Sequence, residues 1–437
     1  MKKSSRIPVY ALLCTLLIIS WFIVVNSKSI TEKQLILIEQ AKVLKNDGVY
    51  IRAVPLLEEA AGYNAAYTIY AENELKETYL ALVDNRGYSR RYVTLLEKQM
   101  NRPDAESYIF IEAANYYLGL LKTQEALTVL RNGVEKTGAP EIIALYEDSR
   151  YVYEINNASY EYVTAIYENT VQVRHNNIWG IAGTDGIIMI PCEYDKISTF
   201  ARDRAIVSKN NNIYAVDRNN NRIAVIHENI YDIGNFAQNR IPLLTESGWC
   251  RATGEFELGK SIFDEIGMYS DGYAAARTNG KWGVIDISDG WLISAEYDDI
   301  IRDELGRCYA QNSVFARKGD DVYLFENGDL TGAVYEDARP FTAEGYAAVM
   351  RNGKWGFIDT GGNEVINFVF DNALSFGQHL AAVKIGELWG YISLNGNVVI
   401  EPVFYEAKSF SGGSAPVLTD RGWQLITLLE YKKGVSL

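Results

Sequence analysis

The spacing of apolar residues changes twice along the chain and divides it into three parts. Residues 7–25 form a continuous apolar run in which only Thr15 and Ser20 are polar. From residue 30 to about 147, apolar residues return every three or four positions, which is the period of an amphipathic helix. Beyond residue 156 this period is lost. Short apolar runs then alternate with Asn-Gly, Asp-Gly and Gly-Gly pairs, which predicts β-hairpins and an α+β multidomain fold.

The apolar run at 7–25 predicts a transmembrane signal-anchor. As a helix it would span roughly 28 Å, close to the hydrocarbon thickness of a bilayer. Lys2, Lys3 and Arg6 precede it, so residues 1–6 are expected in the cytoplasm and the bulk of the chain outside. The competing interpretation is a cleaved signal peptide. Both interpretations predict an extracytoplasmic protein, and the first predicts a single-pass protein of the cell membrane.

A helical segment is expected over residues 29–150, with a first helix that ends at the Asn-Asp-Gly break of residues 46–48. The clearest unit is 105–137, where small residues would let two helices approach and larger ones would fill the space between them. Its in-phase residues are Ala113, Tyr116, Tyr117, Leu120, Ala126, Leu127, Leu130 and Gly133. This unit resembles a tetratricopeptide repeat, and residues 40–60 resemble another more weakly. The segment would be either a peptide-binding groove or a helical spacer.

The segment 158–431 repeats two markers eight times. The first is an aromatic residue, followed in four copies by Gly180, Gly283, Gly356 and Gly390. Its eight copies are Trp179, Tyr214, Trp249, Trp282, Tyr323, Trp355, Trp389 and Trp423. The second marker is an aromatic residue followed by an acid. Its copies are Tyr160-Glu161, Tyr194-Asp195, Tyr231-Asp232, Phe263-Asp264, Tyr297-Asp298, Tyr335-Glu336, Phe370-Asp371 and Tyr405-Glu406. Both markers return about every 34 residues, and extra residues around 302–312 explain the one long interval.

These Trp-Gly repeats resemble the WG-repeat family of bacterial proteins. The resemblance implies a binding or interaction module, with no implied enzyme activity. Four units depart from the motif because another residue replaces the glycine, and in two of them Tyr also replaces Trp. These are Tyr214-Ala215, Trp249-Cys250, Tyr323-Leu324 and Trp423-Gln424. We expect such units to be geometrically irregular.

Each unit reads as four short strands that cannot bury their own apolar face, so neighbouring units must stack. A closed β-propeller and an open β-solenoid both satisfy this requirement. The array begins with the second half of a unit at Tyr160 and ends with the first half of one at Trp423. Joining those halves would complete a blade, which favours a propeller-like ring over the solenoid.

The repeated residues are interpreted as structural. An acid that follows a strand residue commonly accepts hydrogen bonds from turn amides, and a tryptophan that recurs in every unit packs between neighbours. Gly after Trp would allow close approach of the backbone. Aromatic residues outside the repeat pattern, Trp291, Tyr309 and Tyr346, are the better candidates for contact with a ligand.

Amino-acid composition limits the kinds of ligand and catalytic site that we expect in this chain. The net charge is −14, and the first 28 residues hold four basic residues and no acid, so the remainder is strongly acidic and nucleic-acid binding is not expected. Cys192, Cys250 and Cys308 are widely separated and no Cys-x-x-Cys pair exists, which argues against a disulfide framework or a zinc site. The three histidines lie in different units, and no catalytic or phosphate-binding motif is present. We therefore expect no catalytic residue, cofactor or metal.

The sequence predicts a membrane-anchored scaffold that binds a protein or a cell-envelope polysaccharide. One alternative is a cell-envelope glycan hydrolase that uses paired carboxylates on the β array. Another is a ligand sensor that signals through a membrane partner.

Overall fold

The computed structural model describes residues 29–225 and 229–431. It divides between Tyr146 and Glu147 into two compact units. The first unit is helical and the second consists mainly of β-strands, with the end of the last helix just past the boundary. Each unit is described by itself.

The helical unit is built from consecutive short helices, the first of which covers residues 29–46. The helices that follow are α2 (Tyr50–Gly62), α3 (Thr68–Ala81), α4 (Tyr88–Met100), α5 (Ser107–Gly119), α6 (Thr123–Thr137) and α7 (Pro140–Ser149). In the first helix the break falls where the sequence predicted it, and the in-phase residues Ile38 and Ala41 are fully buried.

The unit expected over 105–137 is a helix pair, α5 and α6. Gly133 of α6 lies against Phe110 of α5 and Ile142 of α7, so closely that a Cβ atom there would come within 2.8 Å of the Phe110 ring. The small residue therefore allows the close approach that we expected. Leu120 was expected to fill this interface, but it lies just past the end of α5 and is 49% exposed.

The structure corrects the predicted fold class. No helix within residues 29–225 and 229–431 has the length and apolar character needed to cross a bilayer, which contradicts a single transmembrane helix as part of the fold. The physical reason is that the described helices are short or, like residues 29–46, carry charged residues on their exposed face. Residues 7–25, to which the sequence interpretation assigned the span, lie outside the described residues, as do residues 1–6.

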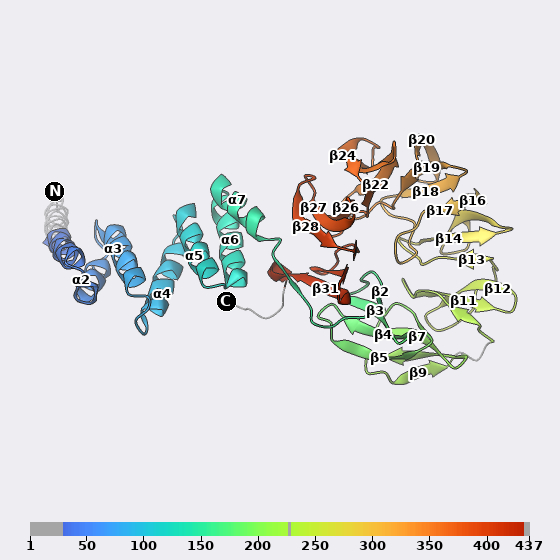
Figure 1. Cartoon of the computed structure of the whole chain (residues 1–437), viewed down its shortest axis with the longest axis horizontal. Coiled ribbons are helices and arrows are strands. Elements are labelled where there is room, and N and C mark those ends of the chain that lie inside the picture. Colours follow the sequence, from blue (N-terminus) through green and yellow to red (C-terminus); the bar gives the residue numbers. More distant parts are fainter. Residues whose placement is uncertain (1–28, 226–228, 432–437) are drawn as a thin grey trace, which may run out of the picture. The chain divides into compact units, whose positions relative to one another are not determined.

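In the described residues the β unit consists of eight antiparallel sheets arranged around a common centre, as in a β-propeller (Figure 1). We number these blades in chain order. Blade 1 contains β2 (Tyr162–Val163), β3 (Thr170–His175), β4 (Ile178–Gly183) and β5 (Ile188–Tyr194). Blade 2 contains β6 (Lys196–Ile197), β7 (Arg204–Lys209), β8 (Asn212–Asp217) and β9 (Arg222–Val225). Blade 3 contains β10 (Asp232–Ile233), β11 (Arg240–Thr245) and β12 (Gly248–Thr253). Blade 4 contains β13 (Glu265–Ile266), β14 (Tyr273–Thr278), β15 (Lys281–Asp286) and β16 (Trp291–Tyr297).

The second half of the ring repeats this order. Blade 5 contains β17 (Asp299–Ile300), β18 (Ser313–Lys318), β19 (Asp321–Glu326) and β20 (Asp329–Tyr335). Blade 6 contains β21 (Asp337–Ala338), β22 (Tyr346–Arg351), β23 (Lys354–Asp359) and β24 (Glu364–Phe370). Blade 7 contains β25 (Asn372–Ala373), β26 (Leu380–Ile385), β27 (Leu388–Ser393) and β28 (Val398–Phe404). Blade 8 contains β29 (Glu406–Ala407), β30 (Ser414–Thr419), β31 (Gly422–Leu428) and β1 (Tyr153–Ile155). A 3-10 turn, Leu429–Tyr431, follows β31.

Blade 8 closes the ring with strands from both ends of the β unit. The strand β1 pairs antiparallel with β31, and Tyr153 lies opposite Leu428. The pairing continues where the Asn156 amide donates to the Leu425 carbonyl at 2.8 Å, and where Tyr160 bridges to Trp423. The two half-units recognised in the sequence therefore complete one blade, and the array is a ring, not an open solenoid. The strand β1 precedes residue 158, where the repeats were expected to begin.

Repeated tryptophans fill the spaces between blades. Trp355 of blade 6 packs with Phe376 and Val383 of blade 7. Trp423 of blade 8 packs with Val163 and Val171 of blade 1. Trp179, Trp249, Trp282 and Trp389 take the same place in their blades. The side chains thus join neighbouring units, as expected for residues that recur at one position.

Glycine after tryptophan accommodates a wide bulge in the next strand. In blade 7 Trp389 pairs with Phe404 and Tyr391 with Ile400, so three residues of β28 face Gly390 alone. A Cβ atom on Gly390 would lie 2.5 Å from the Ile400 carbonyl oxygen. Three of the four units that lack this glycine have an irregular outer edge. In blade 2 Ala215 pairs directly with Ala224, without the three-residue bulge. Blade 3 has no fourth named strand among the described residues, and blade 8 borrows β1.

Candidate functional site

A cavity of about 730 Å³ opens near the centre of the ring. Its walls are the turns that connect the short first strand of a blade to the second strand. Blades 1, 4, 5, 6, 7 and 8 contribute, for example through Tyr167, Ser270, Thr342, Gln378 and Ser411. This volume lies in the usual range for small-molecule sites. Six of the eight blades therefore share one concave site.

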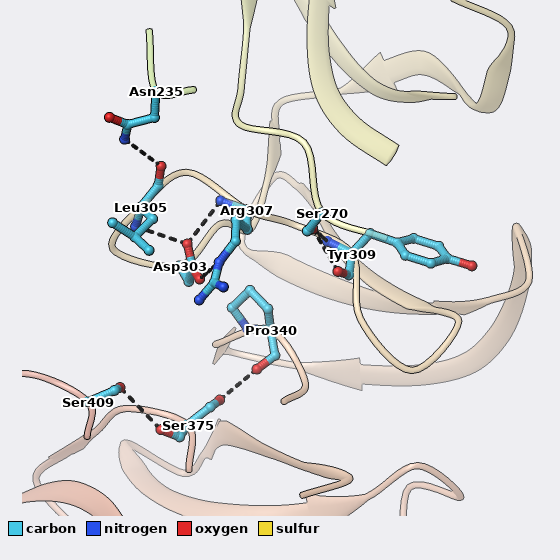
Figure 2. Close-up of polar contacts among 9 residues, drawn as sticks. All are labelled: Asn235, Ser270, Asp303, Leu305, Arg307, Tyr309, Pro340, Ser375 and Ser409. Carbon is cyan, nitrogen blue, oxygen red and sulfur yellow. Dashed lines mark hydrogen bonds and ion pairs between the residues drawn. The ribbon is translucent and has the colours of Figure 1, made fainter. Parts of the chain in front are cut away.

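The extra residues of blade 5, 302–312, extend into this centre and are held there by the neighbouring blades (Figure 2). Leu305 is 4% exposed and packs with Ala165, Ala237 and Met268, which belong to three other blades. Its carbonyl accepts a hydrogen bond of 3.0 Å from the side-chain amide of Asn235. The insertion thus fills one side of the ring centre and forms one wall of the cavity.

The insertion also fixes its own backbone. Asp303 Oδ1 accepts hydrogen bonds from the amides of Leu305 and Arg307, each at 2.9 Å. Asp303 Oδ2 accepts from Arg307 Nε at 2.6 Å. Further along, the Ser270 hydroxyl of blade 4 donates to the Tyr309 carbonyl at 2.8 Å. A loop with so many hydrogen bonds presents its side chains in a defined direction.

An ion pair joins the insertion to the closing blade. Lys408 Nζ lies 3.0 Å from Glu304 Oε1 and 5.0 Å from the centre of the Trp423 ring. The two side chains are 11% and 23% exposed. Burial raises the pKa of Glu304 and outweighs the opposing effect of Lys408. For Lys408, burial acts to lower the pKa, but the Glu304 carboxylate overcomes it and the pKa is raised.

Hydroxyl groups link one cavity-lining turn to the next. Ser375 Oγ donates to the Pro340 carbonyl at 2.7 Å, and Ser409 Oγ donates to the Ser375 carbonyl at 3.3 Å (Figure 2). On the other side of the ring, Thr199 Oγ1 donates to the Phe236 carbonyl at 2.7 Å. The sequence analysis missed these residues. A signal was present, because Thr, Asn or Ser directly precedes the inner aromatic residue in blades 2, 3, 7 and 8.

The repeat-defining residues lie outside the cavity. Acids of the aromatic-acid pairs accept hydrogen bonds from the turn between the second and third strands of their own blade. In blade 6 Glu336 accepts from the Asn352 and Gly353 amides at 2.6 and 2.8 Å. The same contact is made by Glu161, Asp195, Asp264, Asp298 and Asp371. Asp232 instead accepts from Lys196, and Glu406 is exposed.

The aromatic partners of those acids are structural in most blades. Tyr194 and Phe370 are buried and Tyr297 is half-buried, whereas Tyr405 is 56% exposed. These side chains contribute to the contacts within and between blades.

Only one of the three aromatic residues proposed as ligand contacts reaches the cavity. Tyr309 lies in its wall and packs on Tyr273, with ring centres 4.2 Å apart. Trp291 is 41% exposed on β16, where it covers Gly283. Tyr346 packs edge-on against Phe376 in the core. The interruption of the repeat therefore indicated the site better than the aromatic residues did.

A second, smaller depression of about 320 Å³ lies between α3 and α4 of the helical unit. Leu75, Tyr79 and Leu95 form its apolar floor, and Arg90 and Lys98 stand at its rim. Lys98 pairs with Glu72 at 3.0 Å. This depression is where a peptide-binding role of the helical segment would act.

Within residues 29–225 and 229–431, no group of three His, Cys, Asp or Glu side chains is placed to hold a metal ion. In the same ranges the three described cysteines are free thiols. Burial raises the pKa of Cys308 to about 12, which keeps this thiol protonated near neutral pH.

The model of the WG containing repeat matches residues 179–212, 260–282, 332–355, 355–389 and 389–423. No match was found among curated protein sequences. The fold is similar to the AfRom2 CNH domain, at 8% identity and a TM-score of 0.34, over 63% of this chain and 99% of that domain. It is also similar to the Pan2 WD40 domain of Neurospora crassa, at 10% identity and a TM-score of 0.32, over 54% and 89%.

Proposed function

Because this chain belongs to the WG-repeat family through its β unit, we propose that it is a non-catalytic binding module that takes a peptide segment into the central cavity of the ring. The observation that carries the proposal is the insertion at 302–312. It is the one large interruption of the repeat, it is anchored to several blades, and it forms a wall of the central cavity. A structural ring requires no such loop.

The chemistry of the cavity favours a peptide over a sugar. A sugar platform needs an exposed aromatic face, and four of the five aromatic residues in these walls are buried: Phe341, Phe376 and Phe410 are at most 3% exposed and Tyr309 is 7% exposed. Tyr167 alone among them is partly exposed. Charged and amide side chains line the cavity instead. Such groups suit the amides and charges of a peptide.

The test is affinity selection with the full chain and a soluble pool of random tetrapeptides. Peptides that co-elute with the protein are identified by mass spectrometry, and cell-wall oligosaccharides are offered in parallel. Ala343→Trp places a large side chain in the cavity from an exposed wall position. Ser294→Trp, on the exposed face of β16 outside the cavity, is the matched control.

Peptides retained by the wild type and by Ser294→Trp, but lost with Ala343→Trp, would support the proposal. Retention of oligosaccharides alone would overturn the choice of ligand. Retention that survives Ala343→Trp but disappears with Arg90→Glu would move the site to the helical unit. Release of new reducing ends from the oligosaccharides would refute the non-catalytic role and favour the hydrolase.

A further inference from the structure

The cavity contains charged side chains of both signs, and most of them are already occupied. Arg302 stacks 4.0 Å from the centre of the Trp282 ring and donates to Asp299 at 2.9 Å. Arg339 stacks on Trp355 at 4.3 Å and donates to the Ala338 carbonyl at 3.0 Å. These two cations are held by the protein itself.

Most of the acidic side chains in the cavity wall are likewise occupied by groups of the protein. Asp303 accepts three hydrogen bonds within the insertion, and Glu304 pairs with Lys408. Glu344 of blade 6 accepts from the amide of His379 of blade 7 at 3.2 Å. Glu168 of blade 1 also lies in the wall and is exposed. The first three of these carboxylates therefore have a structural partner.

Arg307 keeps a free edge. Its Nε is held by Asp303, which fixes the plane of the guanidinium, while its side chain is 42% exposed (Figure 2). Among the described residues, its two terminal nitrogens have no hydrogen-bond partner. An arginine oriented through Nε presents two parallel N–H groups, which match the two oxygens of a carboxylate.

Asp271 is a free anion of the cavity wall, and it follows directly on Ser270, which contacts the insertion. The turn that carries it is fixed on both sides, because Ser270 donates to the Tyr309 carbonyl and the Gly272 amide donates to Gln238 at 3.0 Å. The Asp271 side chain is exposed in the cavity wall. It forms no hydrogen bond or ion pair within residues 29–225 and 229–431. It can therefore accept hydrogen bonds from a ligand ammonium.

We infer that the cavity recognises a zwitterionic peptide, with a carboxylate at Arg307 and an ammonium group at Asp271. This inference rests on the proposed function, since it specifies the ligand of the same cavity. The protein has fixed the Arg307 guanidinium and the backbone turn of Asp271 before binding, so less conformational entropy is lost when the ligand arrives. The remaining walls, including Ala310, Pro340 and Leu374, supply apolar contact without charge.

The experiment repeats the tetrapeptide selection with four pools, namely free, N-acetylated, C-amidated and doubly blocked. The full chain is compared with Arg307→Gln and Asp271→Asn. Two controls remove the same charges from an exposed ion pair on blade 2 that lies outside the cavity, Arg218→Gln and Asp203→Asn. Arg307→Lys tests whether charge without the planar fork is sufficient.

We expect C-amidation to weaken binding by about tenfold in the wild type and to have no effect in Arg307→Gln. N-acetylation should weaken binding about as much, and this effect should disappear in Asp271→Asn. The controls should behave as the wild type. If all four pools bind equally well and Ala343→Trp abolishes their binding, recognition of a zwitterion is wrong and the peptide-binding proposal stands. If no pool binds, both fail.

Discussion

The wide bulge opposite the repeated glycine makes a stability prediction that can be worked out from the structure. In blade 6, Trp355 pairs with Phe370 and Phe357 with Ile366, so three residues of β24 face Gly356. A Cβ atom on Gly356 would lie 2.8 Å from the Ile366 carbonyl oxygen and 2.9 Å from the Phe368 ring. Real Cβ atoms do not approach other atoms so closely, so β24 must move in Gly356→Ala.

The expected cost follows from two opposing terms. Overpacking of a well-packed site costs about 1–3 kcal/mol. Alanine also restricts the unfolded chain, which returns about 0.4–1 kcal/mol. We therefore expect Gly356→Ala to lower the free energy of unfolding by about 1–2 kcal/mol, or the melting temperature by about 2–8 °C.

Gly361→Ala, in the same blade, is the control. A Cβ atom there would meet only the ends of the Asn363 and Asp359 side chains, at 3.0 and 3.3 Å, and these side chains can move away. Thermal melts give the overall change, and hydrogen exchange of the β23 and β24 amides shows whether it is local. The reasoning would be refuted if Gly356→Ala had the same melting temperature as Gly361→Ala and its β24 amides exchanged no faster than those of the wild type.

Three further predictions concern the hydrogen bonds and ion pairs of the ring. Lys354 first, and then the Gly386 amide, lower the pKa of Asp371 in the folded protein. The ionised carboxylate therefore stabilises the fold fully above the unfolded pKa near 4, and this stabilisation is lost as the pH falls through the folded pKa. Asp371→Asn should accordingly melt below the wild type at pH 7 and together with it near pH 2, and a constant gap across this range would contradict the assignment. Lys408→Met should destabilise the ring more than the double variant Lys408→Met with Glu304→Gln, because the single variant leaves the Glu304 carboxylate in the ring centre without its cation. Denaturant titrations measure both variants, and a less stable double variant would exclude this prediction. Asn156→Pro removes the donor to the Leu425 carbonyl, so hydrogen exchange should rise in β31 but not in β23, and uniform exchange would argue against a local closure.

The sequence carried enough information to predict the ring. Recurrence of Trp355, Trp389 and Trp423 at one position implies contact between neighbours, and the half-units at Tyr160 and Trp423 imply closure. Both inferences use periodicity, which is a local property of the sequence. The three-residue strand β1 carries no such signal, because only its pairing with β31 defines it.

The candidate site was less accessible to sequence reasoning. The extra residues 302–312 were noticed as an irregular interval, but their position depends on contacts with distant segments. Leu305 meets Ala165 and Met268 from other blades, and Glu304 meets Lys408. No spacing rule connects these residues. The transmembrane helix, predicted from hydropathy alone, has no counterpart among the described helices.

The closure of blade 8 also has a consequence for synthesis on the ribosome. Residues 153–155 are made before any other strand of the ring, yet their partner β31 is the last strand to be made. Until β31 emerges, a nascent chain holds seven blades with both ends of the array open, and β1 has no partner. Unpaired strand edges favour aggregation and strand exchange between chains. We therefore expect a pause or truncation just before residue 422 to yield domain-swapped or chaperone-bound chains, although most of the ring has already been made.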